Sequence, residues 1–131
     1  MTMIREPGDW QEDWCNFKPD EFRCSCCNRL EISSDIIDLL QKARNDLGPI
    51  TITSAYRCPS HNASVSSTGE SGPHTTGFAI DIHVSNSQHR KKLIDYFATK
   101  VTGLGVAKTF LHIDLLTPEL GFEMRPNAWK Y

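Results

Sequence analysis

The sequence predicts an α+β domain in which helices pack on one face of a mainly antiparallel sheet. Three observations lead to this prediction. Two segments carry apolar residues at helical spacing, two others alternate between apolar and polar residues, and the order along the chain is helix, strand, strand, helix, hairpin. This order of elements is typical of the α+β class.

Residues 32–48, ISSDIIDLLQKARNDLG, are predicted to form the first helix. Ser33 or Ser34 is suited to cap its start, because a hydroxyl oxygen there accepts a hydrogen bond from a free backbone N–H group. Gly48 follows as a helix terminator, and the β-branched run ITITSA, residues 50–55, predicts the first strand. The apolar stripe of the helix is Ile36, Ile37, Leu40, Ala43 and Leu47.

Residues 58–77 are polar and rich in glycine and serine, and they predict a long loop. Loops of this length in small domains are usually functional or disordered. The next segment, FAIDIHV at residues 78–84, alternates between apolar and polar positions and is predicted to be a strand. A second helix is expected over residues 85–100, because its apolar residues recur at helical spacing.

The last predicted elements form a hairpin. The segment FLHIDLL, residues 110–116, alternates in the same way as the preceding strand, and GLGVAK, residues 103–108, is its expected partner. We expect residues 1–31, which are irregular in pattern, to be a covering segment of the same domain. Residues 32–131 then form the core of that domain.

Size and charge exclude several classes of protein. A chain of 131 residues is one compact domain, too short for two lobes that close over a large cofactor. Lys and Arg number 14 and Asp and Glu number 16, so the formal net charge of −2 lacks the basic excess that nucleic-acid binding requires. The N-terminus has no apolar stretch behind a basic start and no apolar run is long enough to span a bilayer. We therefore expect no nucleic-acid partner, no membrane partner and no signal peptide.

Ligand-type side chains lie on the polar faces of both alternating strands. Asp81 is on the first and His112 on the second, and His74 precedes Asp81 by seven residues. Polar groups removed from water cost several kcal/mol, about 2–7, unless they are paired, and metal coordination would provide that pairing. Two imidazole nitrogens and one carboxylate oxygen leave a fourth position for water, as in catalytic zinc sites. The pattern predicts a zinc site.

Three segments carry a resemblance to a known family: SAYRCPSHN (54–62), SGPHTTGFAIDI (71–82) and GLGVAKTFLHIDL (103–115). They resemble the M15 family of zinc peptidases, in particular its small D-alanyl-D-alanine carboxypeptidase-like branch. That family includes peptidoglycan carboxypeptidases and endopeptidases, many encoded by bacteriophages, and shares its fold with the hedgehog signalling domain. The resemblance implies a hedgehog/DD-peptidase-like fold and zinc bound by the three residues His74, Asp81 and His112.

The resemblance also implies a substrate and residues that bind it. The substrate would be a peptidoglycan stem peptide or cross-link. Arg57, in the SxYR motif with Ser54 and Tyr56, would hold a substrate carboxylate or polarise the scissile carbonyl, for which a planar guanidinium is suited. We expect a monomer that is made in the cytoplasm and reaches the cell wall after release or delivery. Trp129 and Tyr131 are expected to close the core or to line the rim of the cleft.

The sequence leaves the proton acceptor open. Better-characterised relatives have an acidic residue three positions before the last zinc histidine, where this chain has Thr109. Asp114, on the same strand face as His112, is one candidate, and its alternative role is a hydrogen bond to a ligand imidazole. Glu70, beside the metal loop, is another candidate. The chain also departs from many relatives at Gly72, where they have serine.

Two other functions remain open on the same scaffold. The missing acid at residue 109 keeps open a metal-bearing recognition module, and a structural component of a phage particle is a second alternative. The five cysteines are an odd number, so at least one thiol stays free or bridges chains. The cluster Cys24, Cys26, Cys27 lacks the paired spacings of a zinc ribbon, which favours packed thiols or one disulfide over a second metal.

Overall fold

The structure, a computed structural model, describes residues 1–131 and contains three α-helices and two sheets. The larger sheet has the strand order β3, β4, β6, β5, β7, and its neighbours are antiparallel except β5 and β7. The smaller sheet pairs β1 with β2. The predicted α+β class is confirmed. The strands are β1 (Met3–Ile4), β2 (Ile32–Ser33), β3 (Ile52–Ser54), β4 (Ala79–His83), β5 (Gly103–Val106), β6 (Phe110–Asp114) and β7 (Asn127–Lys130).

Helix α1 (Ser34–Leu47) begins and ends where the sequence pattern predicts. Ser33 is its N-cap, and the Oγ atom of this residue accepts a hydrogen bond of 3.1 Å from the backbone N–H group of Asp35. Gly48 ends the helix with a φ angle of 91°, in the left-handed region that favours glycine. The predicted apolar stripe faces inward, where Ile36, Ile37 and Leu40 are fully buried.

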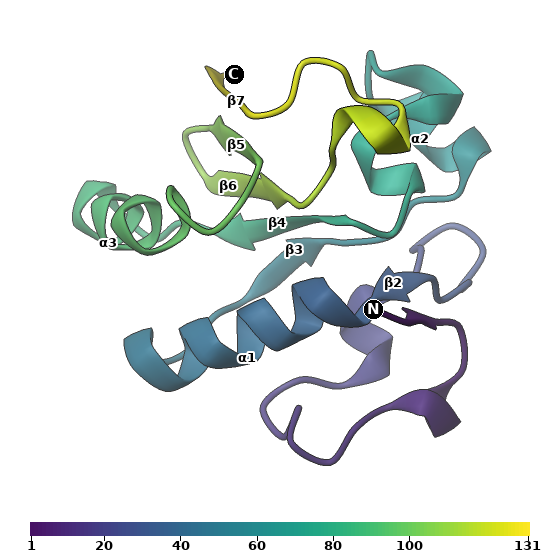
Figure 1. The fold of residues 1–131 in the computed structure, drawn as a ribbon, viewed down its shortest axis with the longest axis horizontal. Helices are drawn as coiled ribbons and strands as arrows, with labels where there is room; N and C mark the ends of the chain where they lie inside the picture. The colour runs from purple at the N-terminus through teal and green to yellow at the C-terminus, as the bar shows by residue number, and fades with distance from the viewer.

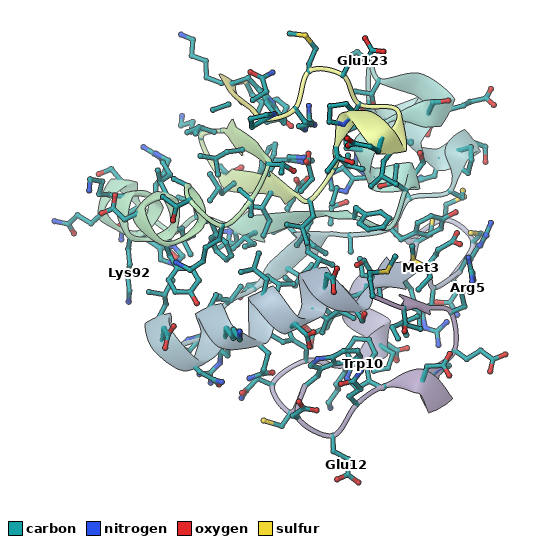
Figure 2. All side chains as sticks on the ribbon, viewed as in Figure 1. Met3, Arg5, Trp10, Glu12, Lys92 and Glu123 are labelled. Atoms are coloured by element: carbon teal, nitrogen blue, oxygen red, sulfur yellow. The ribbon has the colours of Figure 1, made fainter.

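Helix α3 (Ser87–Phe97) is shorter than the predicted segment. Asn86 caps it by accepting a hydrogen bond of 2.8 Å from the backbone of His89. Lys92 donates to the carbonyl oxygen of Leu47 at a distance of 2.8 Å, and Figure 2 shows this side chain extending from α3 toward the end of α1. The two helices are thereby joined at one edge of the domain. No helix in the structure has the length and apolarity needed to cross a membrane.

The apolar core lies between one face of the larger sheet and the helices that cover it. Ile80 and Ile82 of β4 and Leu111 and Ile113 of β6 are all fully buried there, opposite α1 and α3. Figure 1 shows α1 and the N-terminal segment on one side of the sheet, with α2 and the C-terminal segment on the other. The N-terminal segment adds aromatic residues to the same core: Trp14, Phe17 and Phe22.

Residues 58–77 are more ordered than the predicted loop. They contain the helix α2 (Pro59–Val65) and two 3-10 turns, Gly69–Ser71 and Pro73–Thr75. Pro59 occupies the first helical position, where its missing N–H group costs no hydrogen bond. The helix is polar and short, so no apolar stripe in the sequence indicates it.

The edges of the larger sheet differ from the sequence expectation. Strand β3 covers only residues 52–54 of the predicted 50–55, and its register with β4 is irregular between Ile52 and Ser54. Strand β7 was not expected, and it pairs in parallel with β5. A four-residue strand without apolar alternation carries little sequence signal, and its position depends on the partner strand. This strand carries Trp129 to the polar face of the sheet, next to His112.

Candidate metal centre

Two adjacent strands and the turn that precedes them bring the three predicted metal ligands together. Asp81 of β4 and His112 of β6 are direct register partners, and His74 lies in the 3-10 turn ahead of β4. The Oδ1 atom of Asp81 lies 3.2 Å from Nε2 of His74 and 3.1 Å from Nδ1 of His112. All three side chains are buried. The structure therefore gathers residues that are far apart in sequence into one potential metal-binding group.

Hydrogen bonds on the far side of each imidazole determine which nitrogen carries the proton. Nδ1 of His74 lies 2.7 Å from the carbonyl oxygen of Ala55, which only accepts, so this nitrogen is the donor. Nε2 of His112 lies 2.7 Å from Oδ2 of Asp114 and donates to that carboxylate. In the neutral rings, the lone pairs are therefore on Nε2 of His74 and Nδ1 of His112. Both lone pairs face the Asp81 carboxylate.

This donor set fits a metal cation. Two imidazole lone pairs and a carboxylate oxygen converge without a proton between them. These three electron-rich groups repel one another unless a positive charge lies among them. Burial alone raises the pKa of Asp81, but when the rings are protonated, hydrogen bonds from His112 and His74 outweigh burial and hold that pKa well below its usual value. Burial lowers the pKa of His112, whereas its hydrogen bonds to Asp114 and Asp81 raise it, with a net increase. The group therefore attracts positive charge, as a proton or as a metal ion.

Arg57 extends from the end of β3 to the same centre. Its Nη2 atom lies 3.6 Å from Oδ2 of Asp81, its Nε donates to Oγ of Ser54 at 3.1 Å, and its Nη1 donates to Oδ1 of Asn62 at 3.1 Å. Its backbone N–H group donates to the carbonyl oxygen of His74 at 3.0 Å. These contacts hold one guanidinium edge beside the three metal-ligand candidates.

Asn62 of α2 was not singled out by the sequence, although it is only 1% exposed. Besides accepting from Arg57, it donates from Nδ2 to Thr68 Oγ1 at 2.9 Å and to the carbonyl oxygen of Gly69. Gly72 lies against the same side chains, and a Cβ atom there would overlap Thr68 and Asn62. This close approach gives a local reason for glycine where many relatives have serine.

Asp114 lies behind His112 rather than in front of it. Its carboxylate is fully buried and makes a two-point ion pair with Arg125, with Nε to Oδ1 at 3.0 Å and Nη2 to Oδ2 at 2.8 Å. Oδ1 also accepts a hydrogen bond of 3.2 Å from the backbone of Leu116. Burial raises the pKa of Asp114, but the hydrogen bonds from His112 and Arg125 lower it to about 2. Asp114 is thus a carboxylate whose contacts orient the His112 ring.

Two glycines of β5 make room for this arrangement. Gly103 is the register partner of Asp114, and a Cβ atom on it would overlap the Asp114 carboxylate. Gly105 is the partner of His112, and a Cβ atom there would overlap the indole ring of Trp129. The pattern GLG in the predicted hairpin strand is therefore explained by close packing around the metal centre.

A cavity of about 520 Å³ opens in front of the three metal-ligand candidates. His74, Asp81, His112 and Arg57 line one side of it. Aromatic side chains border the same cavity, among them Trp129, whose ring centroid lies 5.3 Å from that of His112. Tyr131, Phe110, Phe122 and Arg125 also line the cavity. The expectation that Trp129 and Tyr131 border a cleft agrees with this placement.

Three other predicted site residues lie outside the cavity lining. Glu70 is exposed in the turn Gly69–Ser71 and is not among the residues that line the cavity. Tyr56 is only 2% exposed, and its ring lies 5.5 Å from the guanidinium carbon of Arg29. Ser54 is the register partner of Asp81 and accepts a hydrogen bond from Arg57, but it is not among the residues that line the cavity. Asp81 is the one carboxylate in the lining.

Comparison with protein families agrees with this geometry. The family described as Peptidase M15 matches residues 15–114, a range that contains Arg57 and all three metal-ligand candidates. The chain belongs to the M15 peptidase family. The match ends before Arg125 and Trp129, so those two cavity residues of this M15 peptidase lie beyond it. Comparison with curated proteins and with solved structures finds no match.

Proposed function

We propose that this M15 peptidase is zinc-dependent and hydrolyses amide bonds in peptidoglycan stem peptides or in their cross-links. The convergence of two imidazole lone pairs and a carboxylate oxygen, each contact within 3.2 Å, is the observation that carries the proposal. His74, Asp81 and His112 would hold the ion. When bound, zinc lowers the pKa of a coordinated water to about 7 and acts as a Lewis acid toward a carbonyl oxygen.

The residues around the ligands suit a peptide with a free or developing negative charge. Arg57 would bind a substrate carboxylate or the oxygen of the scissile carbonyl, because its guanidinium faces the cavity beside Asp81. Trp129 offers an apolar surface beside His112, against which the rest of the stem peptide would pack. The cavity volume of about 520 Å³ is in the range of small-ligand sites.

Of the two sequence-based candidates for proton transfer, Asp114 is better suited to positioning His112. Its oxygens are engaged by His112, Arg125 and a backbone N–H group. A carboxylate that accepts from a ligand imidazole increases the basicity of the ring and fixes its orientation. Glu70 would need to turn toward the cavity to take part in the reaction, since it is exposed outside the lining.

The decisive experiment is mass spectrometry of purified muropeptides digested with the zinc-loaded protein. Loss of a terminal D-alanine would identify a carboxypeptidase, and cleavage within the stem or a cross-link would identify an endopeptidase. We expect hydrolysis to stop with a chelator, to return with zinc, and to be absent in His112→Ala. Wild-type turnover by His112→Ala would overturn the proposal. Because this substrate lies outside the cytoplasm, the enzyme would act after release or delivery to the wall. We propose that it does so as a monomer.

A second candidate function is a metal-bearing recognition module on the same scaffold. One observation favours it. Asp81 is the only carboxylate that lines the cavity and is itself a ligand candidate, so no other carboxylate in the lining could accept a proton from water. Such a module would bind stem peptides tightly without cleaving them. Calorimetric binding of a muropeptide by the zinc-loaded protein, with the peptide recovered intact, would support recognition over hydrolysis. A structural component of a phage particle that uses this site for recognition would give the same result.

A further inference from the structure

Four of the five cysteines gather at a place separate from the cavity. The Sγ atoms of Cys24, Cys27 and Cys58 all lie within 4.8 Å of one another, and the Cys26 thiol is a further neighbour of Cys58. None of the four lines the cavity. We call these residues the cysteine cluster. The fifth cysteine, Cys15, is exposed and contacts Asn16 in a separate part of the N-terminal segment.

The first part of the cysteine cluster is built by a tight turn. The backbone N–H group of Cys24 donates to the carbonyl oxygen of Arg29, and that of Asn28 donates to the carbonyl oxygen of Cys24, both at 2.8 Å. Asn28 has a φ angle of 65°, the left-handed conformation that reverses the chain direction. The turn brings Cys24 and Cys27 to the same side with two residues between them. That spacing is one that zinc sites use for a ligand pair.

The second part comes from the start of α2. Cys58 is the N-cap residue of this helix and follows Arg57 directly in sequence. Its backbone N–H group donates to the Sγ atom of Cys24 at 3.4 Å, across 34 positions of sequence. Donors of this kind around a sulfur atom are typical of metal-bound cysteines, whose sulfur carries negative charge. Cys24 itself is only 1% exposed.

We propose that Cys24, Cys27 and Cys58, with Cys26 as the fourth ligand, form a structural zinc site distinct from the His74, Asp81 and His112 centre. Soft thiolates in a closed set of four are the ligands of structural zinc. The three Sγ atoms of Cys24, Cys27 and Cys58 are all close to one another, as ligands of one metal ion must be, whereas disulfides require closeness only within each pair. The sequence alone favoured packed thiols or a disulfide, because the C-x-C-C spacing lacks a second pair and only the fold adds Cys58.

The site has a consequence for the cavity. A metal ion in the cysteine cluster would fasten the N-terminal segment to the residue that follows Arg57. Arg57 is held from the other side by Asn62 of α2. The ion would therefore fix both the start of α2 and the guanidinium beside Asp81, although it takes no part in the reaction itself.

The test uses zinc stoichiometry in a protein whose other centre has been removed. Purified under reducing conditions and loaded with zinc, His112→Ala is expected to retain one zinc ion per chain by elemental analysis and native mass spectrometry. His112→Ala combined with Cys58→Ser is expected to retain none. The matched control, His112→Ala combined with Cys15→Ser, should keep one. A zinc-free His112→Ala protein, or one that keeps its zinc after Cys58→Ser, would overturn the proposal.

A second measurement does not depend on the folding of any variant. Cobalt added to metal-free, reduced wild-type protein is expected to produce a thiolate-to-cobalt charge-transfer band, which three or four sulfur ligands create and a two-histidine, one-carboxylate centre does not. Absence of this band, or an intact mass showing a disulfide within the cysteine cluster of freshly purified protein, would contradict the zinc site. None of these results depends on muropeptide hydrolysis, so they separate failure of this site from failure of the proposed function.

Discussion

Asp114 and Arg125 form a two-point ion pair behind the candidate metal centre, with distances of 3.0 and 2.8 Å. The carboxylate is fully buried, and the Arg125 side chain is only 8% exposed. The same carboxylate accepts from Nε2 of His112, whose other nitrogen faces Asp81. Hydrogen bonds and ion pairs therefore connect Arg125 in the C-terminal segment, through Asp114 and His112, to the place where a metal would bind.

Asp114→Asn should weaken zinc binding at the histidine centre. The amide keeps the shape of the side chain but removes the charge that fixes the His112 tautomer. Loss of such a partner typically lowers metal affinity or activity by about 10- to 100-fold. Competition with a chromophoric chelator would measure the affinity, and Asp95→Asn, an exposed carboxylate of α3, is the matched control. Equal zinc affinity in the two variants would remove Asp114 from the role of positioning residue.

Arg125→Ala should destabilise the fold more than it changes the chemistry. It leaves the buried Asp114 carboxylate without its cation, and breaking a buried pair costs about 3–5 kcal/mol of unfolding free energy. Chemical denaturation measures this loss. Arg5→Ala removes an exposed pair with Glu31 and should cost less than about 1 kcal/mol. Similar losses in both variants would mean that the Arg125 pair contributes no more than a surface contact.

Gly103→Ala should reduce both stability and zinc binding. The added methyl group would overlap the Asp114 carboxylate, and such overpacking costs about 1–3 kcal/mol. Because the displaced carboxylate would move His112, zinc affinity should fall together with the midpoint of denaturation. Gly8→Ala is the control, since no atom lies near a Cβ placed there. Unchanged zinc affinity in Gly103→Ala would show that the carboxylate can shift without moving the ring.

Asn62→Ala should impair hydrolysis without removing zinc from the histidine centre. Arg57 would lose the Asn62 contact that holds its Nη1 atom, and misplacement of a substrate-orienting group by about 1 Å can cost about 100-fold in rate. We expect kcat/KM to fall by up to about 100-fold, with zinc content unchanged. Ser64→Ala, at an exposed position of the same helix, serves as the control. A loss of zinc together with activity would point instead to a structural role.

Sequence alone identified the elements that have strong local patterns. The stripe of Ile36, Ile37 and Leu40 predicted α1 because burial of one helix face requires apolar residues at that spacing. Alternation predicted β4 and β6, and the spacing of His74, Asp81 and His112 predicted that they meet. Helix α2 and strand β7 escaped prediction because both are short and polar, and tertiary contacts rather than local propensity determine them.

The sequence by itself determined the class of fold and the three metal-ligand candidates, two of which lie on strand faces that a period of two defines. The resemblance of its motif to the M15 family indicated Arg57. Only the tertiary structure decided which other residues contact these side chains and which residues line the cavity. It turned Asp114 toward Arg125, removed Tyr56 and Glu70 from the cavity lining, and brought Cys58 to Cys24. These outcomes depend on contacts between distant segments, which local spacing does not encode, because packing of the whole domain sets which side chains share a buried space.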